Sequence, residues 1–430
     1  MSRLIEALAA KGAPAYLLTA FDLLQFHETA GERLASLPAA EWPRFLAWCD
    51  ARQLSLMLPV ICGSRLPDWL GEQIVKRTAR YELRFERLKR NLFDIVRAFD
   101  EAGLEFVMLK GLSHAPALTP DPKLRAQGDI DLCLIRSSVY EARDVLRGLG
   151  YVPLLDSKGR HLAPMGQPSN WKWRGDQFDP EMPISVELHY ELWSEEAEHI
   201  KVSGLQQFWQ RKKVRSFDGQ QIGVLCDEDL LGFACLHFLL HLLHGELPLQ
   251  RAWEIARFLD AHVNDDVFWA SWRKLHPVTL RRLETCIFRL VTHWFKCRLH
   301  PLLEAECDEL PLGIKLWLDK YYLAPLVQEW APNKAEIWLH LAFLGNNTKD
   351  KMRVLARRLL PASLPAFSDA AIPQLSFGAK AFRLFRQLRL VTSRLTRHLI
   401  TFAPTLLDGM RWFYASKSTT SDDSSSMRIR

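Results

Sequence analysis

The chain has no pair of cysteines in the CxxC spacing that zinc ribbons and thioredoxin-type redox sites use. Its eight cysteines stand singly along the 430 residues. Scattered cysteines of this kind are more often small buried hydrophobic residues of a protein in a reducing compartment. The amino terminus also lacks a long apolar run followed by a small-residue cleavage site. These two absences predict a cytoplasmic protein without a secretion signal.

The sequence has no apolar run long enough for a transmembrane helix. The longest apolar-looking run, Leu230–Leu243, spans fourteen residues and already contains His237 and His241. A membrane span needs about 20 apolar residues, so we expect a buried helix here and no transmembrane segment. Hydrophobic residues make up 48% of the chain and charged residues 25%, which is the balance of a globular protein with two or three lobes.

Three common catalytic motifs are missing as well. The sequence contains no GxxxxGK[ST] loop, no GxGxxG after a strand pattern and no GxSxG turn. The first absence argues against P-loop ATPases, the second against dinucleotide-dependent dehydrogenases, and the third against α/β-hydrolases.

Positive charge is concentrated near the carboxyl terminus. Residues 351–430 carry 14 Lys and Arg against 4 Asp and Glu, whereas residues 1–350 carry 42 basic and 46 acidic residues. Within the basic segment, residues 381–399 have the spacing of an amphipathic helix. Two interpretations stay open: a solvated helix face followed by a tail, or a binding segment for an anionic partner such as nucleic acid, a membrane surface or an acidic protein.

Helical patterns flank a short stretch of alternating strand and helix patterns, which predicts an α+β fold with a small mixed β-sheet core. We expect the following division: an amino-terminal helical region over 1–103, an α/β core over 104–225, a helical domain over 226–350, a basic helical segment over 351–415 and a disordered tail over 416–430. In the core, residues 106–109 and 130–135 read as short buried strands. Residues 184–192 alternate strictly, with Glu187 and His189 on the polar face.

Acidic residues gather on two of these predicted strands. Asp129 and Asp131 flank Ile130, and the two-residue period of a strand sends both carboxylates to one face while Ile130 enters the core. Two carboxylates held this close repel each other unless a cation neutralises them. Oxygen ligands on a rigid strand suit Mg²⁺, which binds through one or two carboxylates and substrate phosphates. Glu187 is the candidate for a third ligand or for a base.

Residues with affinity for phosphate precede these aspartates. Lys110 and Gly111 end the first predicted strand, and Ser113 follows two residues later. A glycine here lets the backbone approach a phosphate, and the start of a following helix would supply amide donors. Arg125, four residues before Asp129, is a candidate partner for either the carboxylates or a triphosphate. Lys110, Gly111, Ser113 and Arg125 therefore form the candidate phosphate-binding set.

This arrangement resembles the nucleotidyltransferase superfamily, which has a polymerase-β-like fold, and it is most similar to a bacterial family of uncharacterised nucleotidyltransferases. The resemblance covers roughly residues 15–265. It is carried by Leu109-Lys110-Gly111, by Arg125 before Asp129-Ile130-Asp131-Leu132, by Val186-Glu187-Leu188-His189, and by the histidine-bearing helix pattern LHFLLHLLHG at 236–245. One departure is that the usual Gly-Gly or Gly-Ser pair is replaced by Gly111-Leu112.

The resemblance implies transfer of a nucleoside monophosphate from a nucleoside triphosphate, such as ATP, to an acceptor with release of pyrophosphate. It implies two Mg²⁺ ions held by Asp129, Asp131 and Glu187, with Lys110 and Arg125 offsetting phosphate charge. The acceptor stays open: a sugar, another small molecule, a protein or RNA. The alternative is a catalytically inactive binding module that keeps the fold and is recruited through its basic carboxyl-terminal helix.

Two further patterns allow more than one interpretation. His237, His241 and His244 share one face of a predicted helix, where they can bind a metal, position substrate or hydrogen-bond within the core. Trp171 and Trp173 alternate with basic residues, which suits either stacking on a base or sugar or a strand with one face in the core.

Overall fold

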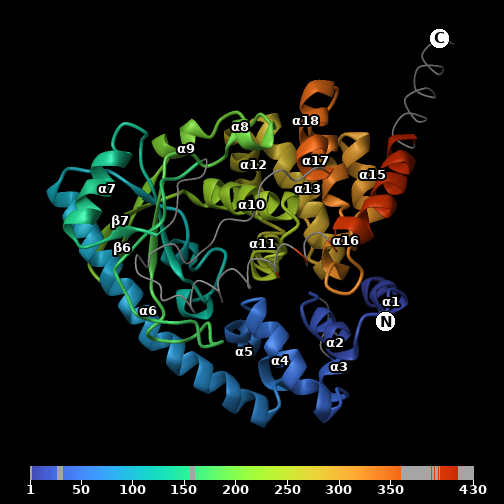
Figure 1. Ribbon diagram of the computed structural model, residues 1–430, viewed down its shortest axis with the longest axis horizontal. Coiled ribbons are helices and arrows are strands. Elements are labelled where there is room, and N and C mark those ends of the chain that lie inside the picture. The colour runs from blue at the N-terminus through green and yellow to red at the C-terminus, as the bar shows by residue number, and fades with distance from the viewer. Residues whose placement is uncertain are drawn as a thin grey trace.

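The computed structural model describes residues 2–26, 32–154, 160–359 and 398–414, together with residues 389, 392 and 396. Most of the basic helix expected over 381–399 and the tail expected over 416–430 lie outside the described residues. In the described part, helices flank one mixed sheet (Figure 1). The predicted α+β fold is therefore confirmed.

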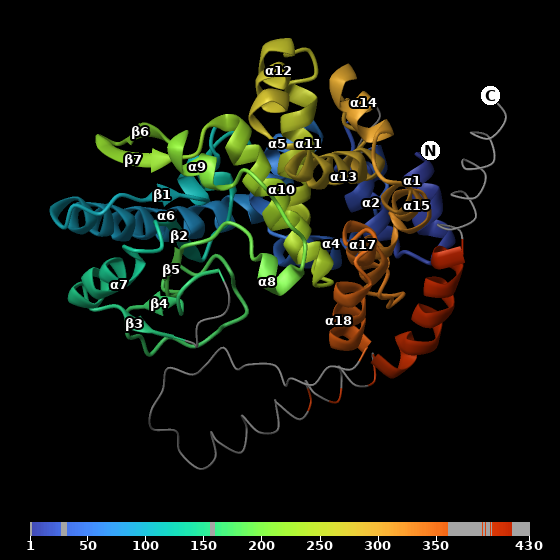
Figure 2. The same ribbon diagram turned by 90° about the horizontal axis from the view of Figure 1, so that it is seen from above.

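The amino-terminal helices lie beside the carboxyl-terminal helical region rather than over the sheet (Figures 1 and 2). They are α1 (Arg3–Ala10), α2 (Ala15–Leu23), α3 (Glu32–Ala35), α4 (Trp42–Ala51) and α5 (Leu58–Cys62), with the short 3-10 turns η1 (Ala39–Glu41), η2 (Ser55–Met57) and η3 (Gly63–Arg65) between them. Their apolar residues, such as Phe21 and Phe45, share one core with the helices that follow the sheet. Burial of this shared core fixes the amino-terminal helices to the rest of the molecule.

The longest helix, α6 (Asp68–Glu101), has 34 residues and runs along the edge of the molecule in Figure 1. The helix predicted within residues 81–102 is confirmed, and it extends back to Asp68, with Pro67 in an extended conformation just before it. Gly103 adopts a φ of +68°, and the backbone N–H of Leu104 donates to the carbonyl of Phe99 at 2.8 Å. This is the glycine-terminated helix end that the sequence predicts.

Seven strands form the sheet within the described residues. They are β1 (Val107–Met108), β2 (Asp129–Cys133), β3 (Val152–Pro153), β4 (Met165–Gly166), β5 (Ser185–His189), β6 (Lys213–Phe217) and β7 (Gln220–Val224). Their order is β3-β4-β5-β2-β1-β7-β6, in which the pairs β2/β5 and β1/β7 are parallel and the other pairs antiparallel. The three strands predicted from the sequence thus occupy the centre of the sheet.

The two faces of the sheet have different coverings. Ile130 and Leu132 of β2 pack with α6 and with α7 (Val139–Gly148) in one hydrophobic core. The opposite face carries Asp129, Asp131 and Cys133, and Cys133 belongs to the larger core that includes α10. The period-two alternation of β2 therefore sends its carboxylates toward the helical region.

Two short helices, α8 (Glu195–Glu198) and α9 (Gln206–Gln210), lie between β5 and β6. The helices after β7 extend from the centre to the right of Figure 1. They are α10 (Asp227–Leu243), α11 (Leu249–Ala261), α12 (Asp266–Leu275), α13 (Val278–Phe295), α14 (Pro301–Asp308), α15 (Leu312–Tyr321), α16 (Ala324–Val327), α17 (Glu336–Phe343) and α18 (Thr348–Leu359). The predicted buried helix at 230–243 is confirmed in α10, which is buried on nearly all sides. Residues 398–414 form a further helix, whose Trp412 stacks on Trp338 of α17 at a centroid distance of 6.2 Å.

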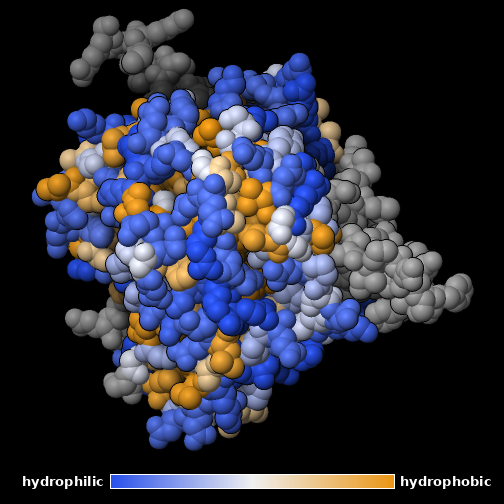
Figure 3. All heavy atoms as spheres, turned by 90° about the vertical axis from the view of Figure 1, so that its left-hand side faces the viewer, coloured by the Kyte–Doolittle hydropathy of each residue, from blue (hydrophilic) through white to orange (hydrophobic). Residues whose placement is uncertain are grey.

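The surface on the side of the sheet mixes hydrophilic and hydrophobic residues (Figure 3). Among the helices that the structure describes, no single one is long and apolar enough to cross a membrane. The bent pair Ala39–Ala51 and Ser55–Cys62, with an angle of 105°, meets the requirement by combined length and composition.

Candidate active site

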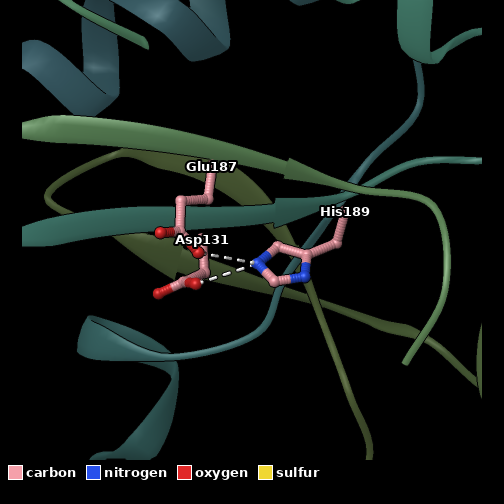
Figure 4. A group of neighbouring side chains, drawn as sticks. All are labelled: Asp131, Glu187 and His189. Atoms are coloured by element: carbon pink, nitrogen blue, oxygen red, sulfur yellow. Dashed lines mark hydrogen bonds and ion pairs between the residues drawn. The ribbon is translucent and has the colours of Figure 1, made fainter. Parts of the chain in front are cut away.

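The centre of the site is the parallel pairing of β2 with β5. Asp131 pairs in register with Glu187, and Cys133 pairs with His189. The Nε2 atom of His189 lies 3.0 Å from Oδ1 of Asp131 and 3.4 Å from Oε2 of Glu187. Figure 4 shows these three side chains pointing toward one another from the two neighbouring strands. One potential ligand atom from each lies within 4.8 Å of the others, so the three side chains can share one metal ion.

Asp129 lies two residues before Asp131 on the same face of β2 and is half-buried. The nearby Asp131 carboxylate, followed by burial, raises the pKa of Asp129. Glu187 adds to this repulsion. The predicted acidic residues thus occupy one electrostatic environment, although Asp129 is outside the group whose ligand atoms converge within 4.8 Å.

Lys110, predicted as a phosphate contact, lies against the carboxylates. Its Nζ atom is 2.8 Å from Oδ1 of Asp131, and both side chains are buried. Burial of Asp131 favours the neutral acid, but the charge of Lys110 and the hydrogen bond from His189 hold the pKa of Asp131 well below its usual range. Asp131 is therefore an ionised carboxylate inside the protein, stabilised by one ammonium group and one imidazole.

Gly111 and Ser113 form a tight turn between Lys110 and the rest of the core. Gly111 has a φ of +75°, and a Cβ at this position would lie 2.5 Å from Oε1 of Gln127. The positive φ favours glycine at this position, whereas the approach of a phosphate to Gly111 stays a prediction. The helix expected after Gly111 is only the 3-10 turn η4 (Gly111–His114), in which the Ser113 hydroxyl donates to the Lys110 carbonyl at 3.2 Å. The expectation of a helix amino terminus here is therefore wrong, because only this short 3-10 turn follows Gly111.

Arg125 precedes β2, just after the 3-10 turn η5 (Pro122–Leu124). Its Nε atom lies 3.2 Å from Oε1 of Glu254 on α11, and both side chains are buried. The Tyr81 hydroxyl donates to the Arg125 carbonyl at 2.6 Å. The partner of Arg125 in this structure is therefore Glu254 rather than the aspartates of β2.

Two arginines that the sequence analysis did not single out lie near the carboxylates. Burial, followed by the charge of Arg125, lowers the pKa of Arg251 on α11 to about 10. The carboxylates of Asp129 and Asp131 oppose that shift. Burial also lowers the pKa of Arg160, against the charges of Asp131 and Glu187. Nothing in the local sequence marks either arginine, because each comes to the site through tertiary structure.

The residues on this face fit a divalent cation. Within the described residues, Oδ2 of Asp131 is buried and has no hydrogen-bond partner. An ionised carboxylate oxygen without a partner is costly inside a protein unless a cation occupies the adjacent space. The oxygen donors of Asp131 and Glu187 suit Mg²⁺ or Mn²⁺, and the nitrogen of His189 suits a transition metal such as Mn²⁺.

His237, His241 and His244, in and just after α10, form no second metal group with the other residues that the structure describes. His241 Nδ1 lies 2.5 Å from Oε2 of Glu246, whereas His244 Nε2 lies 3.0 Å from Oε1 of Glu198. His237 is buried, and burial, followed by the charge of Lys110, holds its pKa well below the usual value. These histidines therefore have separate partners or packing environments.

The tryptophan pair lies in irregular backbone between β4 and β5, so the expectation of a strand there is wrong. The Nε1 atom of Trp171 donates to Oδ2 of Asp179 at 2.9 Å, whereas Trp173 is 60% exposed. In the sheet, the neighbour of β5 on this side is β4, and residues 170–174 belong to no strand. Stacking on a base or sugar stays a prediction for the exposed Trp173.

Comparison with known proteins identifies the family. Residues 38–296, more than half of the chain, match the family described as uncharacterised nucleotidyltransferase. The chain belongs to this family. The match begins later and ends later than the resemblance seen in the sequence, and it contains both the carboxylate face and helices α10 and α11. The chain has no match among curated proteins and none among solved structures.

Membership in a nucleotidyltransferase family indicates a transferase with a nucleotide substrate. The carboxylates of β2 and β5, the adjacent basic residues and the glycine turn all lie within the matched residues. The family match and the geometry therefore point to the same region of the chain.

Proposed function

We propose that the protein is a Mg²⁺-dependent nucleotidyltransferase of the polymerase-β-like superfamily. It would transfer a nucleoside monophosphate from a nucleoside triphosphate to an acceptor hydroxyl and release pyrophosphate. The observation that carries the proposal is the parallel pairing of Asp131 with Glu187, beside a buried oxygen of Asp131 that has no hydrogen-bond partner in the described part of the chain. An excess of carboxylate charge on a rigid sheet suits divalent cations and substrate phosphates.

In this proposal Asp129, Asp131 and Glu187 would hold two Mg²⁺ ions. His189, which contacts Asp131 and Glu187, would orient these two carboxylates. Bound Mg²⁺ would supply charge neutralisation on the triphosphate and a lower pKa for the acceptor hydroxyl. The hydroxyl oxygen forms a bond to the α-phosphorus, and the bond between this phosphorus and the bridging oxygen of the β-phosphate breaks. Glu187 would either ligate the second ion or accept the hydroxyl proton.

The basic residues around the carboxylates would bind the triphosphate. Lys110 and Arg251 carry charges next to Asp131 and Asp129, and Arg125 lies close to Arg251. Lys110 is bound to Asp131 in this structure, so it is free for a phosphate only when another cation neutralises that carboxylate. Gly111 allows the backbone to approach the same phosphates, with Ser113 buried behind it. We also place the protein in the cytoplasm, since its eight cysteines are buried free thiols.

The direct test is incubation of the purified full-length protein with each α-labelled nucleoside triphosphate, Mg²⁺ and cell extract. The expected result is transfer of label to one class of acceptor and release of unlabelled pyrophosphate. Omission of Mg²⁺, or the Asp131→Asn substitution, should abolish labelling. Labelling that persists in the Asp131→Asn variant would overturn the site assignment.

Calorimetry distinguishes the enzyme proposal from the alternative, an inactive binding module. Titration of ATP into the protein with and without Mg²⁺ should give binding that requires the ion if the enzyme proposal is right. Binding that is equal in both conditions would favour the module. An RNA acceptor predicts binding that weakens steeply with salt and is lost on deletion of residues 376–430.

A further inference from the structure

A cavity of about 620 Å³ lies on the same face of the sheet as the carboxylates. This volume falls within the range of roughly 300–1,000 Å³ that small-molecule sites occupy. Its floor is formed by Val107 and Leu109 of the β1 segment and by Cys133 of β2. Its walls include Trp193, Leu205, Phe208 and Trp209.

The cavity lies next to the carboxylate site, at the end of β2. Cys133 in its floor pairs in register with His189, and the Nε2 atom of His189 lies 3.0 Å from Oδ1 of Asp131. Tyr190, the residue after His189, lines the cavity as well. One imidazole therefore stands between the cavity and the carboxylates.

The lining of the cavity is apolar and aromatic, whereas its rim is acidic. Among the residues that line the cavity, Glu191, Glu195 and Glu196 are acidic and Arg136 is cationic. Arg211 and Lys212 lie over the rings of the wall residues Phe208 and Trp209, but each is paired with a carboxylate outside the cavity. Arg136 forms an ion pair with Glu191, and Glu195 accepts a hydrogen bond from the backbone of Val202 at 3.0 Å. Glu196 is exposed. The rim thus has an excess of negative charge, which favours a cationic group on a ligand.

The same charges argue against the triphosphate as the occupant. Lys110 and Arg251 lie around the aspartates at the beginning of β2, whereas the cavity opens at the end of β2. An acidic rim repels a triphosphate, and the cations that suit one are at the other end of the site. The nucleotide and the cavity ligand would therefore approach the carboxylates from opposite sides.

We propose that this cavity binds the acceptor, a small molecule with an aromatic or similarly apolar body, a cationic group at the rim and a hydroxyl directed toward His189. This proposal rests on the proposed nucleotidyl transfer, because the hydroxyl is the group that would bond to the α-phosphorus. It narrows the acceptor from any hydroxyl compound to an amphipathic cation.

Three probes with the same phenol body and different charge test the cavity. They are tyramine, which is cationic, 4-ethylphenol, which is neutral, and 3-(4-hydroxyphenyl)propionate, which is anionic. Titration into the full-length protein without nucleotide, followed by calorimetry, should give affinities in that order. Each step should be about threefold, since exposed ion pairs contribute only modestly. Absence of binding for all three, or a preference for the anion, would overturn the cavity assignment.

Two substitutions locate the binding in the cavity. Glu196→Lys reverses an exposed rim charge, so tyramine should bind about threefold or more weakly and the anionic probe more tightly. Glu72→Lys makes the same charge change on α6, away from the cavity, and should change neither affinity. Equal effects of the two substitutions would mean that the probes bind elsewhere.

Leu205→Trp tests the role of the cavity in transfer, because Leu205 is a half-buried wall residue and the larger ring fills the space. The variant should lose binding of all three probes and labelling of the acceptor in cell extract, yet bind ATP with Mg²⁺ as the wild type does. Retained ATP binding also shows that the variant is folded. Labelling at the wild-type rate with probe binding lost would overturn the acceptor proposal. If the wild type does not bind ATP in a Mg²⁺-dependent way, the proposed function is wrong, whatever the probes show.

Discussion

Two of the buried clusters of charged side chains that the structure describes, one on the sheet and one between helices, differ in how well their charges are matched. In the helical cluster, His276 lies between Asp229 and Glu284, with nitrogen–oxygen distances of 3.1 and 3.0 Å. Arg211 and Trp272 donate further hydrogen bonds to these carboxylates. In the sheet cluster, Asp131 directly contacts one ammonium group and one imidazole, and the charges of Arg160 and Arg251 act on the three carboxylates without a direct ion pair to them.

The difference is reflected in proton affinity. Burial favours the neutral ring of His276, but the carboxylates of Glu284 and Asp229 outweigh it and raise the pKa of His276 to about 9. In the helical cluster the protonated His276, Arg211 and Trp272 therefore neutralise or hydrogen-bond both carboxylates. In the sheet cluster the pKa of Asp129 is raised by Asp131 and then by burial, and Oδ2 of Asp131 lacks a partner among the described residues. Matched charge stabilises the fold, whereas unmatched charge is available for a ligand.

The largest effect is expected on turnover, from a substitution that removes a charge from the sheet cluster. Asp131→Asn keeps the volume and one acceptor oxygen for Lys110 and His189, but removes the charge that would hold Mg²⁺. Turnover should fall by about 10³-fold or more, since a metal ion contributes several kcal/mol to such a transition state. Measurement of label transfer from an α-labelled triphosphate checks this. Asp100→Asn, an exposed change at the end of α6, is the matched control and should have no effect.

The second prediction breaks the helical cluster. Glu284→Gln leaves the protonated His276 with one carboxylate fewer in a fully buried site. The free energy of unfolding should fall by about 3 kcal/mol, because removal of one partner from a buried ion pair leaves charge uncompensated. Urea denaturation measures the loss. The folded fraction should still bind ATP with Mg²⁺ normally, and a variant as stable as the wild type would contradict the role given to this cluster.

Dependence on pH sharpens the same contrast. The pKa of His276 is raised to about 9 in the folded protein, so its stabilising effect is complete below about pH 6.5, the unfolded value, and is lost as the pH rises to 9. The free energy of unfolding should therefore fall by on the order of 2–3 kcal/mol between pH 6.5 and 9. Urea titrations across this range test the sign. His276→Gln should flatten the profile, and a wild-type profile that rises with pH would refute the assignment.

The smallest expected effect is a gain in stability rather than a loss. Asp129→Asn removes one of three repelling carboxylates, so without metal the variant should be slightly more stable than the wild type at pH 7. Asp229→Asn in the helical cluster should instead destabilise the protein. Thermal unfolding in the presence of a chelator compares the two. Destabilisation by both substitutions would mean that the sheet cluster is a structural network like the helical one.

Much of the sheet could be read from the sequence, because the alternation of residues 184–192 and the pattern Asp129-Ile130-Asp131 have a two-residue period that only a strand satisfies. The hairpin of β6 and β7 was missed, although Asp218 and Gly219 are a strong hairpin signal and both have positive φ. This miss was avoidable, since the turn residues were visible in the sequence.

Other features of the site could not be predicted from local patterns. Arg125 and Glu254 form their ion pair across 129 positions of sequence, and Arg251 and the cavity walls come to the site in the same way. Periodicity reports which face of an element is buried, but it does not report which distant element covers that face. The predicted division of the chain into five segments stays a prediction.

The central claim is that the carboxylates of β2 and β5 hold divalent cations. Calorimetric titration of Mn²⁺, a spectroscopically convenient substitute for Mg²⁺, into the wild type and the Asp129→Asn and Asp131→Asn variants tests it most directly. We predict binding to the wild type, and affinities at least about tenfold weaker in both variants, since each loses a charged ligand. Equal Mn²⁺ affinity in all three proteins, or no binding to the wild type with or without ATP, would contradict the claim.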